Sequence, residues 1–164
     1  MTLGLVDTLI LGGKTTQIAS NIGTNLIIST ITTTTTAIIN VLDYLTTSTY
    51  YKTNGISELI TNIQEMDLEF TIVVIEQVIR EQNDKQLPES IKRALLGLND
   101  ILTQIHIELN TIKESIENHT KKYFNNWRYF QCNITTITIR KHYEILKSRH
   151  TILFDLLKIY NNNI

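Results

Sequence analysis

The sequence is poor in residues that interrupt helices and in residues that cross-link the chain. Its 164 residues include one proline, Pro88, and one cysteine, Cys132. A single cysteine cannot form an internal disulfide and supplies neither a metal cluster nor a redox pair. This excludes a disulfide scaffold and favours a reducing compartment. Because proline is nearly absent, long helices meet few covalent obstacles.

Charge is also scarce in the first part of the chain. Residues 1–42 contain two charged side chains, Asp7 and Lys14, and residues 15–42 contain none. The start lacks the basic region of a secretory signal and carries Asp7 inside its apolar run, so we predict an intracellular protein, in the cytoplasm or a virion. The uncharged run is rich in threonine and asparagine, and these polar side chains favour a packed helix over a membrane-spanning one.

Length and composition predict one globular domain covering residues 1–164. The chain is 42% apolar and 19% charged, as in globular proteins. Its formal net charge of -1 creates no overall electrostatic field that would attract nucleic acid or a membrane. A chain of this length buries roughly two-thirds of its unfolded surface around a single core. The abundance of Ile, Thr and Asn is typical of AT-rich coding sequences, which predicts a source such as a large DNA virus or an AT-rich protist.

Residues 88–119 carry the clearest helical pattern in the chain. Apolar side chains recur there at alternating spacings of four and three, as in an amphipathic helix. Pro88 and Glu89 suit the first turn of such a helix. Because this stripe cannot stay in water, the flanking segments are expected to supply matching stripes. The repeating positions are Ile91, Leu95, Leu98, Leu102, Ile105, Leu109, Ile112 and Ile116.

The charge-poor region, residues 1–50, is expected to be helical, with a short extra helix ahead of a break at Gly12 and Gly13. The β-branched residues 32–36 individually favour extended structure. A repeat at spacings of four and three outweighs them and predicts a helix. That repeat consists of Ile31, Thr35, Ile38, Leu42 and Leu45.

A second helix is expected over residues 54–82, after the turn signal of Asn54 and Gly55. Residues 72–75 also resemble the core of a strand, but the longer helical period favours a helix. The predicted stripe changes phase slightly after Val73. It consists of Ile56, Leu59, Ile63, Met66, Phe70, Val73, Val74 and Val78.

The last helix is expected over residues 121–160. Two apolar seams there are displaced from one another by two residues, so we predict a kink near residues 134–139, where alternation also resembles a strand. Together the four regions predict an all-α fold, an antiparallel bundle of four main helices joined by short connections.

The two halves of the chain carry opposite charge. Residues 54–118 contain twelve acids and five bases, and residues 119–164 contain eight bases and two acids. We therefore expect the basic end to dock on the acidic middle, within one chain or between copies.

The basic end is also the best candidate for a binding surface. Bases with interleaved aromatics can hold nucleic acid by phosphate contacts and stacking, but these aromatics fall on the helical seam, which favours a core position. An anionic membrane fits the same charges. The candidate residues are Lys121, Lys122, Arg128, Arg140, Lys141, Lys147 and Arg149.

No pattern in the sequence indicates catalysis. Gly13-Lys14-Thr15 resembles the end of a phosphate loop, but Thr8 stands where the motif needs glycine and no strand of adequate length precedes it. The four histidines include no i,i+4 pair, which disfavours a metal site. No nucleophile, base and orienting group can be assembled. We therefore predict no enzyme, cofactor, metal or small-molecule substrate.

The layout resembles the helical-bundle domains of cell-death effectors, namely the fungal HeLo domain and the N-terminal bundle of mixed-lineage kinase domain-like proteins. The likeness consists of the nearly uncharged N-terminal region, the Leu/Ile seam of residues 91–116 and the following Trp127-Arg128. The resemblance implies a bundle that acts on membranes through residues 1–42 or through the bases after Lys121.

Two functional hypotheses follow from these patterns. The first is a non-enzymatic structural or interaction protein that assembles through its apolar helix seams with a protein partner or with itself. The second is a membrane-active bundle that uses its charge-poor N-terminus. Its candidate membrane-facing residues are Ile31, Ile38 and Leu42.

Overall fold

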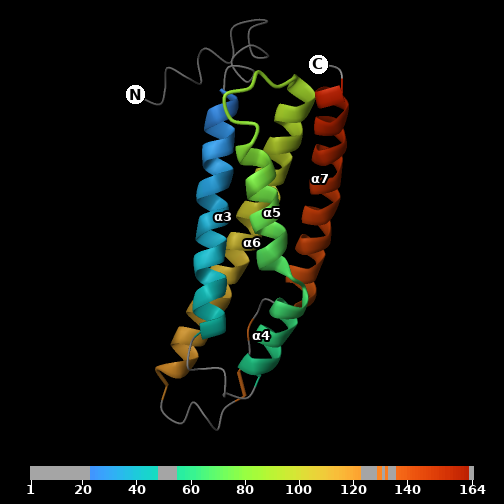
Figure 1. The fold of residues 1–164 in the computed structure, drawn as a ribbon. Coiled ribbons are helices and arrows are strands. Elements are labelled where there is room, and N and C mark those ends of the chain that lie inside the picture. Colours follow the sequence, from blue (N-terminus) through green and yellow to red (C-terminus); the bar gives the residue numbers. More distant parts are fainter. Residues whose placement is uncertain (1–22, 48–54, 123–128, 131, 133–135, 163–164) are drawn as a thin grey trace, which may run out of the picture.

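The computed structural model describes residues 23–47, 55–122, 129–130, 132 and 136–162 (Figure 1). Throughout these residues the regular structure is α-helical, which confirms the predicted all-α bundle. The extra helix expected before Gly12 lies outside the described residues. The helices are α3 (Thr24–Thr47), α4 (Ile56–Glu65), α5 (Leu68–Arg80), α6 (Glu89–Thr120) and α7 (Thr136–Asn162).

The four long helices alternate in direction along the sequence, with α3 and α6 running one way and α5 and α7 the other (Figure 1). The helix α6 packs most extensively, on α3 and on α7, and α3 also packs on α5. The α3–α6 pair is parallel: Asn25 bonds to Asp84, just ahead of α6, and Lys113 near the end of α6 lies 4.6 Å from the Tyr44 ring centroid. The bundle therefore combines antiparallel and parallel neighbours.

The central helix α6 is the element around which the core is built. All eight positions of its predicted seam are buried, and Leu102 has no exposed surface. Two further side chains, Ile101 and Glu108, are also buried on this helix. Because α6 offers apolar side chains to α3 and to α7, its stripe is wider than the two positions per heptad of a simple two-stranded seam.

The helix α3 confirms the predicted stripe of the charge-poor region. Its hydroxyl groups bond within the helix: Thr30 donates to the Leu26 carbonyl at 2.9 Å and Thr34 to the Thr30 carbonyl at 3.0 Å. These bonds satisfy polar groups without help from another element. The candidate membrane-facing residues Ile31, Ile38 and Leu42 are instead buried in the core, because this apolar side meets α6 and α5.

The predicted helix over residues 54–82 is wrong in one respect: it is divided into α4 and α5. Asp67 separates the two helices with φ 53 and ψ 37, a left-handed backbone conformation. The apolar stripe of α5 therefore does not continue the stripe of α4. The stripe predicted through Phe70 and Val73 is therefore wrong beyond Met66, and both side chains are exposed. The buried side chains of α5 are Leu68, Ile72, Ile75 and Ile79.

The predicted helix over residues 121–160 is also shorter than expected. It begins at Thr136, and Tyr129, Phe130 and Cys132 lie outside any helix. Phe130 is buried, with its ring 5.5 Å from the His119 ring in an edge-on arrangement. Two seams displaced by two residues cannot face one core from a single straight helix. Of the first seam, Phe130 is buried outside any helix and Ile137 is exposed on α7, whereas residues 123, 127 and 134 lie outside the described residues.

Candidate functional site

The outer side of α5 carries apolar side chains that the bundle does not cover. Phe70 is 64% exposed and Val73 is 44% exposed. Residues three apart lie on the same side of a helix, so these two side chains are neighbours. They adjoin a shallow groove of about 580 Å³ lined by Val73, Glu76, Gln77, Arg80 and Glu81. We call this set, with Glu69 and Phe70, the α5 face.

Charges flank the apolar part of the α5 face. At the C-terminal end Arg80 pairs with Glu76, with 2.6 Å between Nη2 and Oε1, while the Arg80 side chain stays 61% exposed. At the N-terminal end the carboxylate of Glu69 is exposed. The face therefore carries Glu69 beside the phenyl ring at its N-terminal end, and Arg80 together with the acids Glu76 and Glu81 at its C-terminal end.

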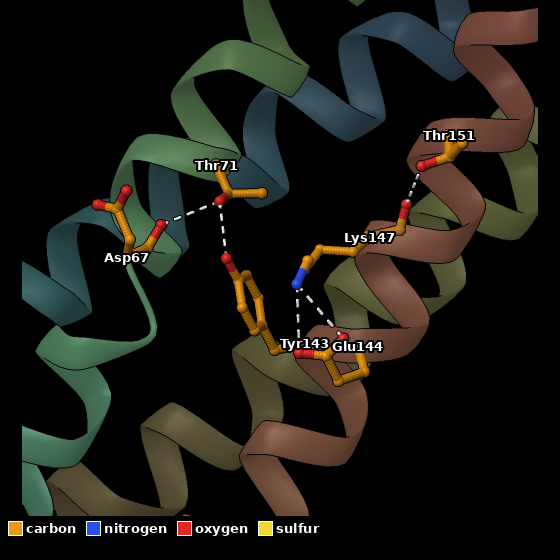
Figure 2. Close-up of polar contacts among 6 residues, drawn as sticks. All are labelled: Asp67, Thr71, Tyr143, Glu144, Lys147 and Thr151. Atoms are coloured by element: carbon orange, nitrogen blue, oxygen red, sulfur yellow. Dashed lines mark hydrogen bonds and ion pairs between the residues drawn. The ribbon is translucent and has the colours of Figure 1, made fainter.

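The lower part of α5 is joined to α7 by a polar contact (Figure 2). The Thr71 hydroxyl donates to the Asp67 carbonyl at 3.0 Å and lies 3.1 Å from the Tyr143 hydroxyl. Since the Thr71 proton is directed to Asp67, the Tyr143 hydroxyl is the donor to Thr71. The Lys147 ammonium lies 5.2 Å from the Tyr143 ring centroid and 3.4 Å from the Glu144 carboxylate. This contact fixes α5 against α7 at one end.

Further along, the same two helices enclose a cleft of about 420 Å³, which we call the α5–α7 cleft. Phe154 on its α7 side is 50% exposed, whereas Leu157 at its floor is buried. An acid and a base, Glu81 and Lys158, lie on opposite sides of it. The cleft is lined by Val78, Glu81, Gln82, Phe154, Leu157, Lys158, Asn161 and Asn162.

The interface of α6 with α7 contains polar side chains within an apolar surrounding. Oε1 of Glu108 lies 2.8 Å from Nδ1 of His142, an ion pair if the ring is protonated, although the ring N–H is not aligned for a hydrogen bond. The Arg149 guanidinium donates to the Gly97 carbonyl. Burial lowers the pKa of the His150 imidazole below its ordinary value of 6.5.

The predicted basic residues that the structure describes are divided between the end of α6 and several turns of α7. Lys121 and Lys122 are exposed just after α6, and Arg140 and Lys141 are exposed on α7. Lys147 is engaged with Glu144 of the same helix. Arg149 is partly buried against α6, and Arg128 lies outside the described residues.

Among the described residues, the one Asp or Glu contact between the acidic middle and the basic end is that of Glu108 with His142, and it involves none of the Lys or Arg side chains of the predicted electrostatic docking. The ion pairs Arg80–Glu76, Arg93–Glu89 and Lys147–Glu144 each lie within a single helix. The α6–α7 interface is mainly apolar, because Leu146, Leu153 and Leu157 face the same core as the α6 seam. Apolar burial therefore outweighs opposite charge in placing α7.

Within the described part of the chain, no group of three or more His, Cys, Asp or Glu side chains is close enough to hold a metal ion. The fold defines a class of protein, the all-α helical bundle, with exposed apolar side chains such as Phe70 on α5 and Phe154 on α7. Searches of protein-family models, curated proteins and solved structures found no match to the chain.

The α5 face was missed by the sequence reasoning because Phe70 and Val73 were assigned to the buried stripe. A usable signal was present. Leu68, Ile72, Ile75 and Ile79 repeat at spacings of four, three and four, which places Phe70 and Val73 outside their stripe.

Proposed function

We propose that this protein is a non-enzymatic interaction protein that assembles with further copies of itself through the α5 face. The observation that carries the proposal is the exposure of Phe70 beside a groove on its own helix. Aromatic side chains that insert into a groove contribute strongly to protein interfaces. The expected unit is a two-fold dimer, because one surface then serves both partners.

The register of the dimer follows from the positions of the groups on α5. With two α5 helices antiparallel, Phe70 of each copy meets the groove around Gln77 of the other. The same register brings Glu69 of each copy to Arg80 of the other, which pairs opposite charges at both ends. Val73 lies near the centre of the contact. Apolar and charged groups thus select the same register, which supports this orientation over a parallel one.

Sedimentation velocity over a range of protein concentrations tests the proposal. The wild-type protein is expected to form dimers as concentration rises, and Phe70→Asp is expected to weaken the dimer by roughly 30-fold or more, the loss of a central aromatic contact. Ile137→Asp is the matched control, because Ile137 is 78% exposed on α7, away from the α5 face. A wild-type protein that stays monomeric throughout, or equal weakening by both substitutions, contradicts the proposal.

A second candidate is a membrane-active bundle, and one observation favours it. Within the described chain, α3 is 24 residues long and apolar enough to cross a membrane by length and composition. Its apolar stripe is covered by α5 and α6, so membrane contact requires the bundle to open. Opening would exchange one apolar environment for another, and apolar burial at about 25 cal/mol per Å² could then drive interfacial binding.

Co-sedimentation with anionic liposomes separates the two candidates. The assembly proposal predicts no binding of the folded wild-type protein at physiological salt. Robust binding that is abolished by Ile31→Asp and Ile38→Asp would instead support the membrane candidate. Because both residues are buried, the folding of each variant must be verified by circular dichroism. Thr33→Asp, an exposed change on the same helix, is the control for charge alone.

A further inference from the structure

The outer side of α7 carries a second set of apolar side chains that the bundle leaves uncovered. Ile137 is 78% exposed and Ile159 is 60% exposed, and α7 lies at one edge of the bundle (Figure 1). Between them, Lys141, Ser148 and Asp155 are also exposed. Steps of four and seven residues keep side chains on one side of a helix, so all five share the outer side of α7. We call these five residues the α7 stripe.

The α7 stripe has the same pattern when it is followed from either end. Its spacings are 4, 7, 7 and 4 residues, with Ser148 in the middle. Isoleucine stands at both ends, and the two inner positions carry opposite charges, Lys141 and Asp155. A two-fold axis at Ser148 would therefore place isoleucine beside isoleucine and each charge beside its opposite. A helix with this pattern is complementary to an antiparallel copy of itself.

The side chains next to the stripe fit the same arrangement. Ile152 is 55% exposed, and Ile145, on the same side of α7, is partly buried. They lie four residues after and three residues before Ser148, so in an antiparallel pair Ile152 of one copy meets Ile145 of the other. The small Ser148 side chain lets the two helices approach closely at the centre. Within the described chain neither Lys141 nor Asp155 belongs to an ion pair, which leaves both charges available to a partner.

We infer that a second copy of the chain docks on the α7 stripe, antiparallel to the first, about a two-fold axis at Ser148. Ile137 of each copy packs against Ile159 of the other, and Lys141 pairs with Asp155. The contact has no aromatic anchor of the kind that dominates strong interfaces, so it forms at higher protein concentration than the α5 dimer. At concentrations where the α5 dimer forms alone, Ile137→Asp therefore has no effect.

A second two-fold contact changes the kind of assembly that the protein forms. One such contact gives a closed dimer. Two different contacts on each chain alternate and join four or more copies, in a closed tetramer or an open chain. This consequence rests on the proposed α5 dimer. The α7 contact itself does not, because it uses other residues on another helix.

Disulfide trapping measures the α7 contact separately from the α5 face. The one native cysteine, Cys132, is first replaced by serine. Ser148→Cys then places a thiol at the two-fold axis, where two closely packed helices bring the two thiols within bonding range. Under mild oxidation this variant is expected to form covalent dimers at least about tenfold faster than Arg140→Cys, an exposed position on another side of α7 that reacts by random collision. Adding Phe70→Asp should leave the trapping rate unchanged.

Exchange of the two charges tests the register of the contact. In the Ser148→Cys chain, Lys141→Glu is expected to slow trapping about fivefold at low salt, because both ion pairs become like-charge pairs. Adding Asp155→Lys should restore the rate, since the two charges have then exchanged places. Arg140→Glu is the matched control, because it makes the same charge change at a neighbouring exposed residue that lies off the stripe.

Three results would overturn the inference. They are trapping of Ser148→Cys that is no faster than that of Arg140→Cys, equal slowing by Lys141→Glu and Arg140→Glu, and a double charge variant that is slower than Lys141→Glu alone. Failure of the proposed α5 dimer gives a different pattern. Association at low protein concentration would then be absent, while trapping of Ser148→Cys and its sensitivity to Lys141→Glu would remain.

Discussion

The Glu108 carboxylate of α6 and the His142 imidazole of α7 lie 2.8 Å apart, with 11% of the Glu108 side chain and 22% of the His142 side chain exposed. The second carboxylate oxygen, Oε2, is buried and has no hydrogen-bond partner among the described residues. A mostly buried carboxylate whose one close partner among the described residues is an imidazole depends on that partner. This contact and the hydrogen bond from Arg149 to the Gly97 carbonyl are polar points within a mainly apolar α6–α7 interface.

Removal of the partner should therefore be costly. His142→Ala is expected to lower the free energy of unfolding by up to about 3 kcal/mol, because Glu108 would remain in an apolar surrounding without its close polar partner. The double variant Glu108→Leu, His142→Leu should recover most of this loss. Urea denaturation measures all three proteins. A His142→Ala variant that unfolds at the same urea concentration as the wild type would show that the pair contributes nothing.

The lowered pKa of His150 predicts a pH dependence of stability. Burial disfavours the charged imidazole, so between the lowered folded-state pKa and the ordinary value of 6.5 the unfolded chain binds more protons. Stability contributed by neutral His150 is therefore present above pH 6.5 and is lost as pH falls through this window. The difference in unfolding free energy between wild type and His150→Gln should rise with pH there. A difference that is independent of pH would contradict the prediction.

Charge in the α6 seam should destabilise the whole bundle. Leu102→Asp places a carboxylate at a position with no exposed surface, at a cost of several kcal/mol against a typical total of about 5 to 15 kcal/mol. Cooperative thermal unfolding, followed by circular dichroism, should be lost. Gln104→Asp, an exposed change two residues away, should melt like the wild type. Equal melting of both variants would mean that this stripe is not buried.

Two glycines should respond oppositely to alanine. Gly55 has φ +88, and a Cβ there would lie 3.1 Å from the Phe130 carbonyl oxygen, so Gly55→Ala should lower stability by about 1–3 kcal/mol. Gly97 lies inside α6, where a Cβ meets only the Arg149 side chain at 3.9 Å. Gly97→Ala should raise stability by about 0.5–1 kcal/mol through helix propensity. Thermal melts of both variants check the sign of each effect.

The charges of the α5 face provide a test of the dimer register. Glu69→Arg should weaken dimerisation, because it places like charges opposite Arg80 of the other copy. Adding Arg80→Glu in the same chain should restore it, since the two charges have exchanged places. Sedimentation velocity at low salt is the measurement, and high salt should reduce both effects. If the double variant is weaker than either single variant, the antiparallel register is wrong.

The seams of α3 and α6 could be predicted because they depend on local order. A spacing of four and three places each apolar residue on one side of a helix whatever the partner is, so Ile38 and Leu102 are buried as expected. Threonine hydroxyls that bond within α3 likewise need only the preceding turn, as Thr34 does with the Thr30 carbonyl. Such features are determined within about one turn of chain, and the sequence alone specifies them.

The tertiary structure decided three other features. They are the side of α5 that is buried, the parallel pairing of α3 with α6, and the partner of Glu108. A left-handed residue at Asp67 rotates the following helix and moves Phe70 from the predicted core to the surface. The sequence of α5 holds two competing apolar stripes, and spacing alone does not say which of them faces the core. Glu108 is buried at an α6 position whose neighbour, His142, is 34 positions away along the chain. Burial of a charge depends on which groups another helix brings to it, and that is settled only when the helices pack.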